Sequence, residues 1–239
     1  MRVLLICLSS FLTFILAAII VAKPWVTIHH TKPIVVKGYA EQPVHADTGS
    51  LTASVQSTGQ SNADAYRHAG RSLERVHQLA TEILGEDFAL IELPASVYPV
   101  NKLNAQGKKT NFVDFYSASR SYRFDTDNVQ GLEKLGRALY DLNAESININ
   151  VNGPEFFISN LDEIKLNLVK AATANGKERA QIMASSSGED LGSLVAARQG
   201  VIQITKTNST ETSSWGMYDT QTIDKVVKLV VTLEYDIGS

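Results

Sequence analysis

Four residues of this chain have side chains suited to binding or hydrolysing a small ligand, provided that the fold brings them together. Asp47 is an acidic residue at the start of an apolar strand pattern, and Arg120 interrupts an aromatic line formed by Tyr116 and Tyr122. A carboxylate, a guanidinium and phenol rings around one pocket would hold a small polar ligand. Each charged residue also has a structural interpretation, Asp47 as a turn residue that accepts backbone N–H bonds and Arg120 as the ion-pair partner of a neighbouring helix.

The histidines do not predict a metal site. His68 and His77 lie nine positions apart on one predicted helix, about half a turn out of register at 3.6 residues per turn. They cannot share a face, and zinc needs three or four converging ligands. The glycines at 188, 192 and 200 lack phosphate-loop spacing. We therefore predict no catalytic constellation, no metal and no cofactor.

One polar loop carries an apolar cluster that could contact another protein. Trp215, Met217 and Tyr218 lie in the segment 208–220, which is otherwise polar. Apolar clusters that stay exposed often mark contact surfaces. The alternative is that the loop folds back over the sheet, and the sequence leaves both interpretations open.

The first residues of the chain predict a membrane anchor. Residues 3–22 contain no charge, follow Arg2 and precede Lys23. Twenty residues of helix span about 30 Å, the thickness of a bilayer's hydrocarbon core. A cleaved signal peptide has a shorter apolar run and a small-x-small site, whereas Ile20 stands at the first of those positions. An uncleaved membrane anchor is preferred, with a removed peptide as the alternative.

The remaining composition restricts the class of protein. The net charge is −3, so nothing indicates a nucleic-acid partner. Cys7 is the single cysteine and lies in the apolar run, so the rest of the chain has neither a disulfide nor a cysteine nucleophile. We expect an anchor at 1–22, a linker at 23–33 and one domain at 34–239.

Hydrophobic periodicity predicts an α+β domain with antiparallel sheets and about three packed helices. Strands are expected at 34–39, 46–57, 88–100, 112–124, 147–158 with a break at 152–154, 191–205 with a bulge at Gly200, and 222–237. Helices are expected at 61–84, opened by Ser61 as N-cap and closed by Gly85; at 127–142, opened by Asp127; and at 160–186, opened by Asn160.

Each helix shows the apolar stripe that would cover a sheet. The predicted inward residues are Tyr66, Ala69, Leu73, Val76, Ala80 and Ile83 in the first, Val129, Leu132, Leu135, Leu139 and Leu142 in the second, and Leu161, Ile164, Leu168, Ala172, Gly176, Ala180 and Met183 in the third. In the last strand, Lys225 is the one exception on an otherwise apolar face.

Several of these segments together resemble the SIMPL-domain family of bacterial envelope proteins. The similarity lies in the run from Val35 to Glu41, in Ala46-Asp47-Thr48 with the following helix, in the strand 115–119, and in 147–159 with the later alanine-rich helix. Ala174-Asn175-Gly176-Lys177 departs from the alanine and arginine that the family tends to have there. The match consists of fold-bearing positions and contains no catalytic signature.

The resemblance implies a periplasmic location, assembly of some members into large rings, and a link to oxidative stress. Two functions follow as hypotheses. The preferred one is a non-enzymatic, homo-oligomeric assembly or interaction protein whose protein partner the sequence does not name. The alternative is a small-ligand-binding or hydrolytic envelope protein that uses Asp47 and Arg120.

Overall fold

The computed structural model describes residues 33–238, which form two compact units. Unit 1 contains residues 33–41, 165–202 and 228–238, and unit 2 contains 42–164 and 203–227. The elements are β1 (Ile34–His45), β2 (Thr48–Gly59), α2 (Asn62–Leu84), β3 (Ala89–Leu103), β4 (Lys109–Thr126), α3 (Val129–Ala138), the 3-10 helix η1 (Leu139–Glu145), β5 (Asn148–Phe157), α4 (Leu161–Ser186), β6 (Asp190–Gln199), β7 (Gln203–Lys206), β8 (Met217–Tyr218) and β9 (Asp224–Gly238).

This architecture confirms the predicted α+β class, with antiparallel sheets and three α-helices among the described residues. One sheet has the strand order β3-β4-β2-β5 and the other β1-β9-β7-β8, with β6 also paired to β9. The pair β7 and β8 is parallel.

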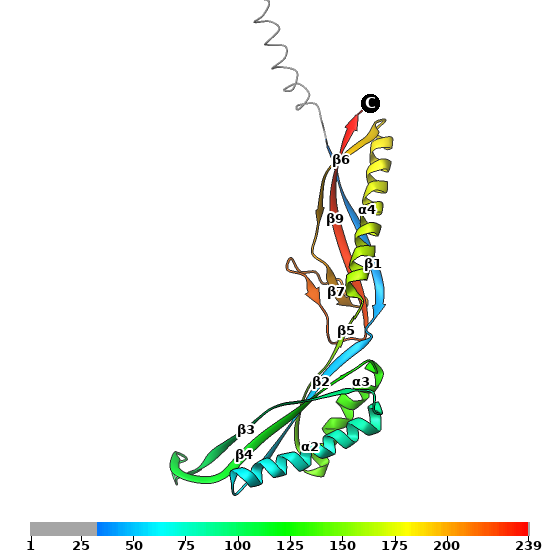
Figure 1. The fold of residues 1–239 in the computed structure, drawn as a ribbon. Helices are drawn as coiled ribbons and strands as arrows, with labels where there is room; N and C mark the ends of the chain where they lie inside the picture. The colour runs from blue at the N-terminus through cyan, green and yellow to red at the C-terminus, as the bar shows by residue number, and fades with distance from the viewer. Residues whose placement is uncertain (1–32, 239) are drawn as a thin grey trace, which may run out of the picture. The chain divides into compact units, whose positions relative to one another are not determined.

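Unit 2 is built on the sheet β3-β4-β2-β5, with α2 and α3 packed on one face (Figure 1). The strand β2 places Leu51, Ala53 and Val55 toward the helices, and all three are fully buried. Its antiparallel partners are β4 on one side and β5 on the other. Because side chains alternate between faces, the residues between those three point to the opposite face of the sheet.

The helix α2 follows its predicted signals closely. The Ser61 hydroxyl accepts the Asp64 N–H at 3.1 Å, and Gly85 ends the helix with a positive φ of 79°. Its buried stripe consists of Ala65, Ala69, Leu73, Val76, Ala80 and Leu84. Tyr66 and Ile83 were also predicted in that stripe. Ile83 is half-buried and packs against the core beside Leu84, whereas Tyr66 is exposed because Ala65 occupies the inward position.

The second helix begins one residue later than predicted and tightens before its end. Asn128, not Asp127, is the N-cap, and its side-chain oxygen accepts the Gly131 N–H at 2.9 Å. The last two residues of the predicted stripe, Leu139 and Leu142, belong to η1 and are buried. The hydrophobic face therefore continues across a change of helix type.

Three predicted strands differ from those in the structure. β5 runs unbroken through residues 152–154, because the irregularity is absorbed by a register shift against β2 between Ser50 and Thr52. The segment predicted as one strand at 191–205 is divided into β6 and β7, and Gly200 lies between them with its N–H donated to the Val230 carbonyl. The first strand is longer than expected and continues to His45.

In unit 1, α4 runs along β1 and β9 (Figure 1). Small residues allow the close approach: an added Cβ on Gly38 of β1 would lie 2.0 Å from the Ala172 carbonyl oxygen of α4. Ile164, Leu168, Ala172, Gly176 and Ala180 are buried as predicted. Met183 was predicted inward but is 49% exposed, and Ala184 is buried in its place.

The predicted anchor at residues 3–22 lies outside the described residues. Within residues 33–238, none of the helices combines the length and apolar character needed to cross a bilayer.

Candidate functional site

Arg120 lies in a small polar cluster between β4 and α2. Its guanidinium forms an ion pair with Glu92 of β3 at 2.5 Å and lies 4.5 Å from the centroid of the Tyr66 ring. Gly70 of α2 makes room for it, since an added Cβ there would lie 2.6 Å from Nη1. The hydrogen bond that Arg120 donates to the Glu92 carboxylate raises the pKa of Arg120, so the group stays charged. Within the described chain, its buried Nε atom has no hydrogen-bond partner.

A cavity of about 700 Å³ opens beside Arg120. It is lined by Tyr66, Arg67, His68, Gly70, Arg71, Glu74, Arg120 and Tyr122. Burial raises the pKa of the Tyr122 phenol, so this group is a neutral hydrogen-bond donor at physiological pH. Arg120 and Tyr122 were both predicted site residues, and the structure brings them together. Arg67 and Arg71 were missed by sequence reasoning, because surface arginines on a helix carry no distinguishing pattern.

Tyr116 is on the same face of β4 as Arg120 but does not line this cavity. It pairs across the sheet with Gly59 and Pro99, and its side chain packs against the hydrophobic core of unit 2. Its position is explained by packing.

Asp47 is far from Arg120. The cross-strand neighbour of Arg120 is Val55, eight residues after Asp47, which corresponds to about 26 Å along a strand. The Asp47 carboxylate accepts the Ser159 backbone N–H at 2.8 Å and the Ser159 hydroxyl. Burial works to raise the pKa of Asp47, but these two hydrogen bonds lower it below its ordinary value. The carboxylate accepts a backbone N–H as the structural interpretation predicts, but from a residue 112 positions away and not within a local turn. It does not share a site with Arg120.

The predicted interaction loop is only partly free. Trp215 is 93% exposed, whereas Met217 and Tyr218 form β8 beside β7. The Tyr218 ring lies 6.4 Å from the ring of Phe157, so it folds partly onto the sheet. Of the two interpretations of this loop, exposure applies to Trp215 and also to Tyr218, which is 44% exposed, whereas Met217 is half-buried.

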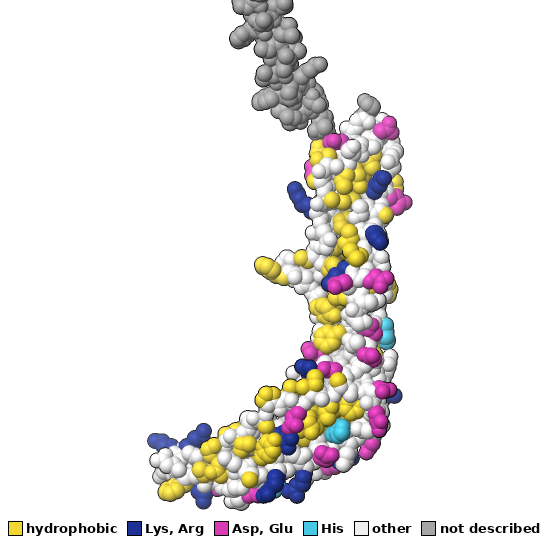
Figure 2. Space-filling model, in the orientation of Figure 1, with side chains coloured by type: hydrophobic (Ala, Val, Ile, Leu, Met, Phe, Trp, Pro, Cys, Tyr) yellow, Lys and Arg dark blue, Asp and Glu magenta, His cyan; other side chains and the backbone are white. Residues whose placement is uncertain are grey.

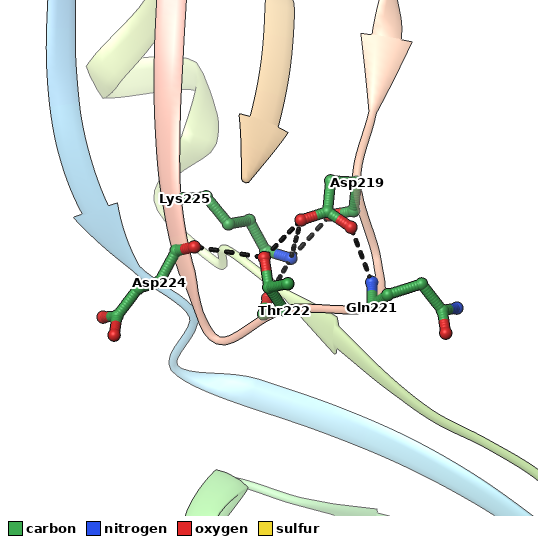
Figure 3. Close-up of polar contacts among 5 residues, drawn as sticks. All are labelled: Asp219, Gln221, Thr222, Asp224 and Lys225. Carbon is green, nitrogen blue, oxygen red and sulfur yellow. Dashed lines mark hydrogen bonds and ion pairs between the residues drawn. The ribbon is translucent and has the colours of Figure 1, made fainter. Parts of the chain in front are cut away.

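The sequence analysis missed a buried polar centre at Lys225 (Figure 3). Lys225 is fully buried on the apolar face of β9, and its Nζ donates to the backbone carbonyl oxygens of Asp219, at 2.5 Å, and Thr222. The Asp219 carboxylate lies 3.9 Å from Nζ and accepts the Gln221 N–H and the Thr222 hydroxyl. In the sequence, this centre is indicated only by Lys225 itself, the single lysine on the apolar face of the last strand.

Charge and burial compete in this centre. Burial lowers the pKa of Lys225, and Asp219 opposes the change. Burial would raise the pKa of Asp219, but the hydrogen bonds from Thr222 and Gln221 and the charge of Lys225 lower it. The centre holds the loop that connects β8 to β9, which is a structural role.

The histidines of unit 2 have separate partners. His45 lies 2.8 Å from the Asp224 carboxylate, and His68 lies 2.8 Å from the Thr58 carbonyl oxygen. His77 packs edge-on against Phe88 and Tyr122. Across residues 33–238, no three His, Cys, Asp or Glu side chains are grouped as metal ligands.

A model of the family described as "SIMPL: Protein of unknown function (DUF541)" matches residues 34–230 of the chain. No curated protein matches it. Among solved structures, a putative amidohydrolase/peptidase from Burkholderia cenocepacia is 14% identical with a TM-score of 0.31, over 48% of this chain and 30% of that protein. An uncharacterized conserved protein from Listeria innocua is 10% identical with a TM-score of 0.22, over 80% and 91%. Both TM-scores are too low to support an argument about fold or function.

Proposed function

The chain belongs to the SIMPL family, and on that premise we propose that it is a non-enzymatic assembly module, anchored in the bacterial inner membrane by residues 3–22, whose periplasmic body forms homo-oligomers through unit 1. The observation that carries the proposal is the exposed apolar surface of unit 1. Large apolar side chains are exposed on every element of this unit: Val35, Tyr39, Leu166, Ile182, Met183, Leu194, Val195, Val201 and Val230.

The helix α4 contributes a large share of this surface. Leu166 is 64% exposed and Ile182 is 59% exposed, and Figure 2 shows hydrophobic side chains gathered over α4. A helix that covers a sheet normally turns polar residues outward. Exposed apolar area of this kind is typical of surfaces that associate with another protein.

The strand β6 provides a second reason. It pairs with β9, and two of its large apolar residues, Leu194 and Val195, are 48% and 55% exposed at an irregularity in that pairing. An edge strand with exposed apolar side chains is prone to pair with another chain. A second copy of unit 1 that packs here would cover the free edge of β6 and its exposed apolar side chains.

The predicted anchor supports self-association of this unit in particular. Unit 1 contains β1, which begins at Ile34, twelve positions after the end of the predicted apolar run. In anchored copies, unit 1 would therefore be held near the bilayer surface at a raised local concentration.

Light scattering of the full-length protein in detergent tests this proposal. We expect a mass of several copies for the natural chain, and a single copy for the double variant Leu194→Lys, Val195→Lys. Leu103→Lys is the matched control, because Leu103 is 63% exposed but lies in β3 of unit 2. A natural chain that stays monomeric at all concentrations contradicts the proposal.

Location is tested separately with intact spheroplasts of a bacterium that expresses the chain. If the body lies in the periplasm, added protease cleaves it without lysis, and residues 1–22 stay with the membrane. Protection of the body until lysis would contradict the proposed orientation.

A second candidate function is ligand binding in the cavity beside Arg120. The unpartnered Nε of Arg120 and the neighbouring Arg71 favour a small anion such as a carboxylate or phosphate. Titration with inorganic phosphate, followed by calorimetry, tests it. Binding that is weakened by Arg71→Gln supports this function, and the absence of heat for the natural chain rejects it.

A further inference from the structure

The outward face of the sheet in unit 2 is polar but carries almost no charge. Between Thr52 and Thr58 of β2, the residues that face away from α2 and α3 are all hydroxyl or amide side chains. Their neighbours are of the same kind: Ser117, Ser119 and Ser121 on β4, and Asn148, Asn150 and Asn152 on β5. Beyond β4, Ser96 and Tyr98 of β3 continue this set, and Leu93, opposite Ser121, interrupts it. The first charged neighbour is Arg123, opposite Thr52.

This composition is unusual for a solvent-facing surface. Charged residues make up 20% of the chain, and a soluble surface is designed to contain about 25–35% of them. On this face of the sheet, the positions between Thr52 and Thr58 of β2 and their neighbours are uncharged. Most of the outward-facing residues on β2, β3 and β5 are exposed to solvent. They are Gln56, Thr58, Ser96, Tyr98, Asn148, Asn150 and Asn152. We refer to these residues, with Ser117, Ser119 and Ser121, as the hydroxyl-amide face.

Part of the face is held in place by its own hydrogen bonds. The Gln56 amide donates to the Ser117 hydroxyl at 2.9 Å and to the Tyr98 hydroxyl at 3.0 Å, and the Ser54 and Ser121 hydroxyls lie 2.7 Å apart. These contacts fix donors and acceptors at the surface before any ligand arrives, which reduces the entropy cost of binding.

A cavity opens on this face. Its volume is about 570 Å³, and its lining includes Gln56, Tyr98, Phe115, Ser117 and Asn148 of the sheet. His68 of α2 also lines it, so the cavity reaches the end of the sheet where α2 begins. This volume is in the range of small-molecule sites. Tyr98 and Phe115 add aromatic surface to a polar lining, a combination suited to a ligand that has both hydroxyl groups and apolar C–H faces.

The chemistry of the face selects its ligand. Sugar hydroxyls donate and accept at once, and so do Ser, Thr, Asn and Gln, whereas ammonium groups only donate and ionised carboxylates only accept. A nucleic acid would require Lys and Arg contacts to its phosphates. A second copy packed sheet against sheet would require an apolar face. The uncharged face therefore matches a neutral polyol as its ligand.

We propose that the hydroxyl-amide face binds an uncharged polysaccharide chain, with a sugar ring in the cavity beside Tyr98 and Phe115 and neighbouring sugars along β5 and β2. The exposed amides of Asn148, Asn150 and Asn152 supply further contacts at about 6.6 Å intervals, the repeat of one strand face.

Calorimetric titration of the full-length protein with chitohexaose and with cellohexaose tests the proposal. The protein is held in nanodiscs free of sugar-based detergent, which would compete for the site. We expect saturable binding of at least one of the two neutral hexasaccharides. Absence of binding by both overturns the proposal.

Two variants locate the site. Ser119→Glu places a charge in the middle of the face, and its desolvation should weaken binding by about tenfold or more. Tyr98→Ala removes an exposed aromatic ring with little risk to folding, and should weaken binding by about three- to tenfold. Gln78→Glu, an exposed position on α2, is the charge-matched control and should bind like the natural chain.

Thermal melting followed by circular dichroism verifies that each variant is folded. Retained affinity in both folded site variants overturns the proposed location. If neither sugar binds and Ser119→Glu instead reduces the mass measured by light scattering, the face is a contact between copies and the polysaccharide proposal is wrong.

Discussion

Gly38 of β1 lies against the backbone of α4 at Ala172, so closely that an added Cβ would be 2.0 Å from the Ala172 carbonyl oxygen. The opposing Gly176 contributes to the same contact, with its own virtual Cβ 3.2 Å from the Gly38 Cα and 2.7 Å from the Leu233 Cδ1 atom. The packing of the helix on the sheet in unit 1 thus depends on two residues without side chains.

Substituting these glycines should give a graded loss of stability. Gly38→Ala meets backbone atoms, which cannot move aside, and should lower the free energy of unfolding by about 3 kcal/mol or more. Gly176→Ala meets mainly the end of a flexible leucine side chain and should cost about 1–2 kcal/mol. Urea denaturation followed by circular dichroism measures both. Gly238→Ala, which meets nothing within 4 Å, is the control, and equal stability of all three variants would contradict the packing argument.

The N-cap of α3 gives a second prediction, in which the structure and the sequence pattern disagree. Asn128→Ala should lower the free energy of unfolding by about 1 kcal/mol, because the Gly131 N–H loses its side-chain acceptor. Asp127→Ala at the residue predicted from sequence should have a smaller effect. The reverse order in thermal melting would favour the sequence-based cap.

Asp47 and Arg120 should behave as independent residues. Because they lie about 26 Å apart along β2, the stability losses of Asp47→Ala and Arg120→Ala should add within about 0.5 kcal/mol in the double variant. Chemical denaturation of the two single variants and the double variant completes the cycle. A coupling above about 1 kcal/mol would revive a common site.

The Lys225 centre predicts a pH dependence of stability. The pKa of Asp219 is lowered in the folded state, so the unfolded state binds more protons as the pH falls through the ordinary value of 3.8. Its contribution is therefore present above pH 3.8 and is lost as the pH falls through the folded pKa. Asp219→Asn should be less stable than the natural chain at pH 6, with the difference shrinking toward pH 3.

Urea denaturation at pH 6, 5, 4 and 3 measures this difference. Asp190→Asn is the control, because Asp190 is an exposed carboxyl at the start of β6 and lies outside the Lys225 centre, so its difference should stay small throughout. A difference for Asp219→Asn that is constant across the range would mean that the carboxylate charge does not stabilise the fold.

The sequence alone determined the features that depend on one element at a time. The alternation of Leu51, Ala53 and Val55 predicted the buried face of β2, and the three- and four-residue steps of α2 predicted most of its buried stripe. Local periodicity reports which face of an element is apolar, and local capping chemistry reports where a helix begins, as at Ser61. The family resemblance also rested on such positions and was confirmed over residues 34–230.

The tertiary structure decided everything that depends on which residues meet across the chain. Arg120 finds Glu92 and the space above Gly70, whereas Asp47 finds Ser159, and no local pattern distinguishes these outcomes. Lys225 was visible in the sequence only as an exception, and its partners came from the folding of a loop. The hydroxyl-amide face exists because the registers of four strands align their uncharged residues on one side, and register is a property of pairing between strands.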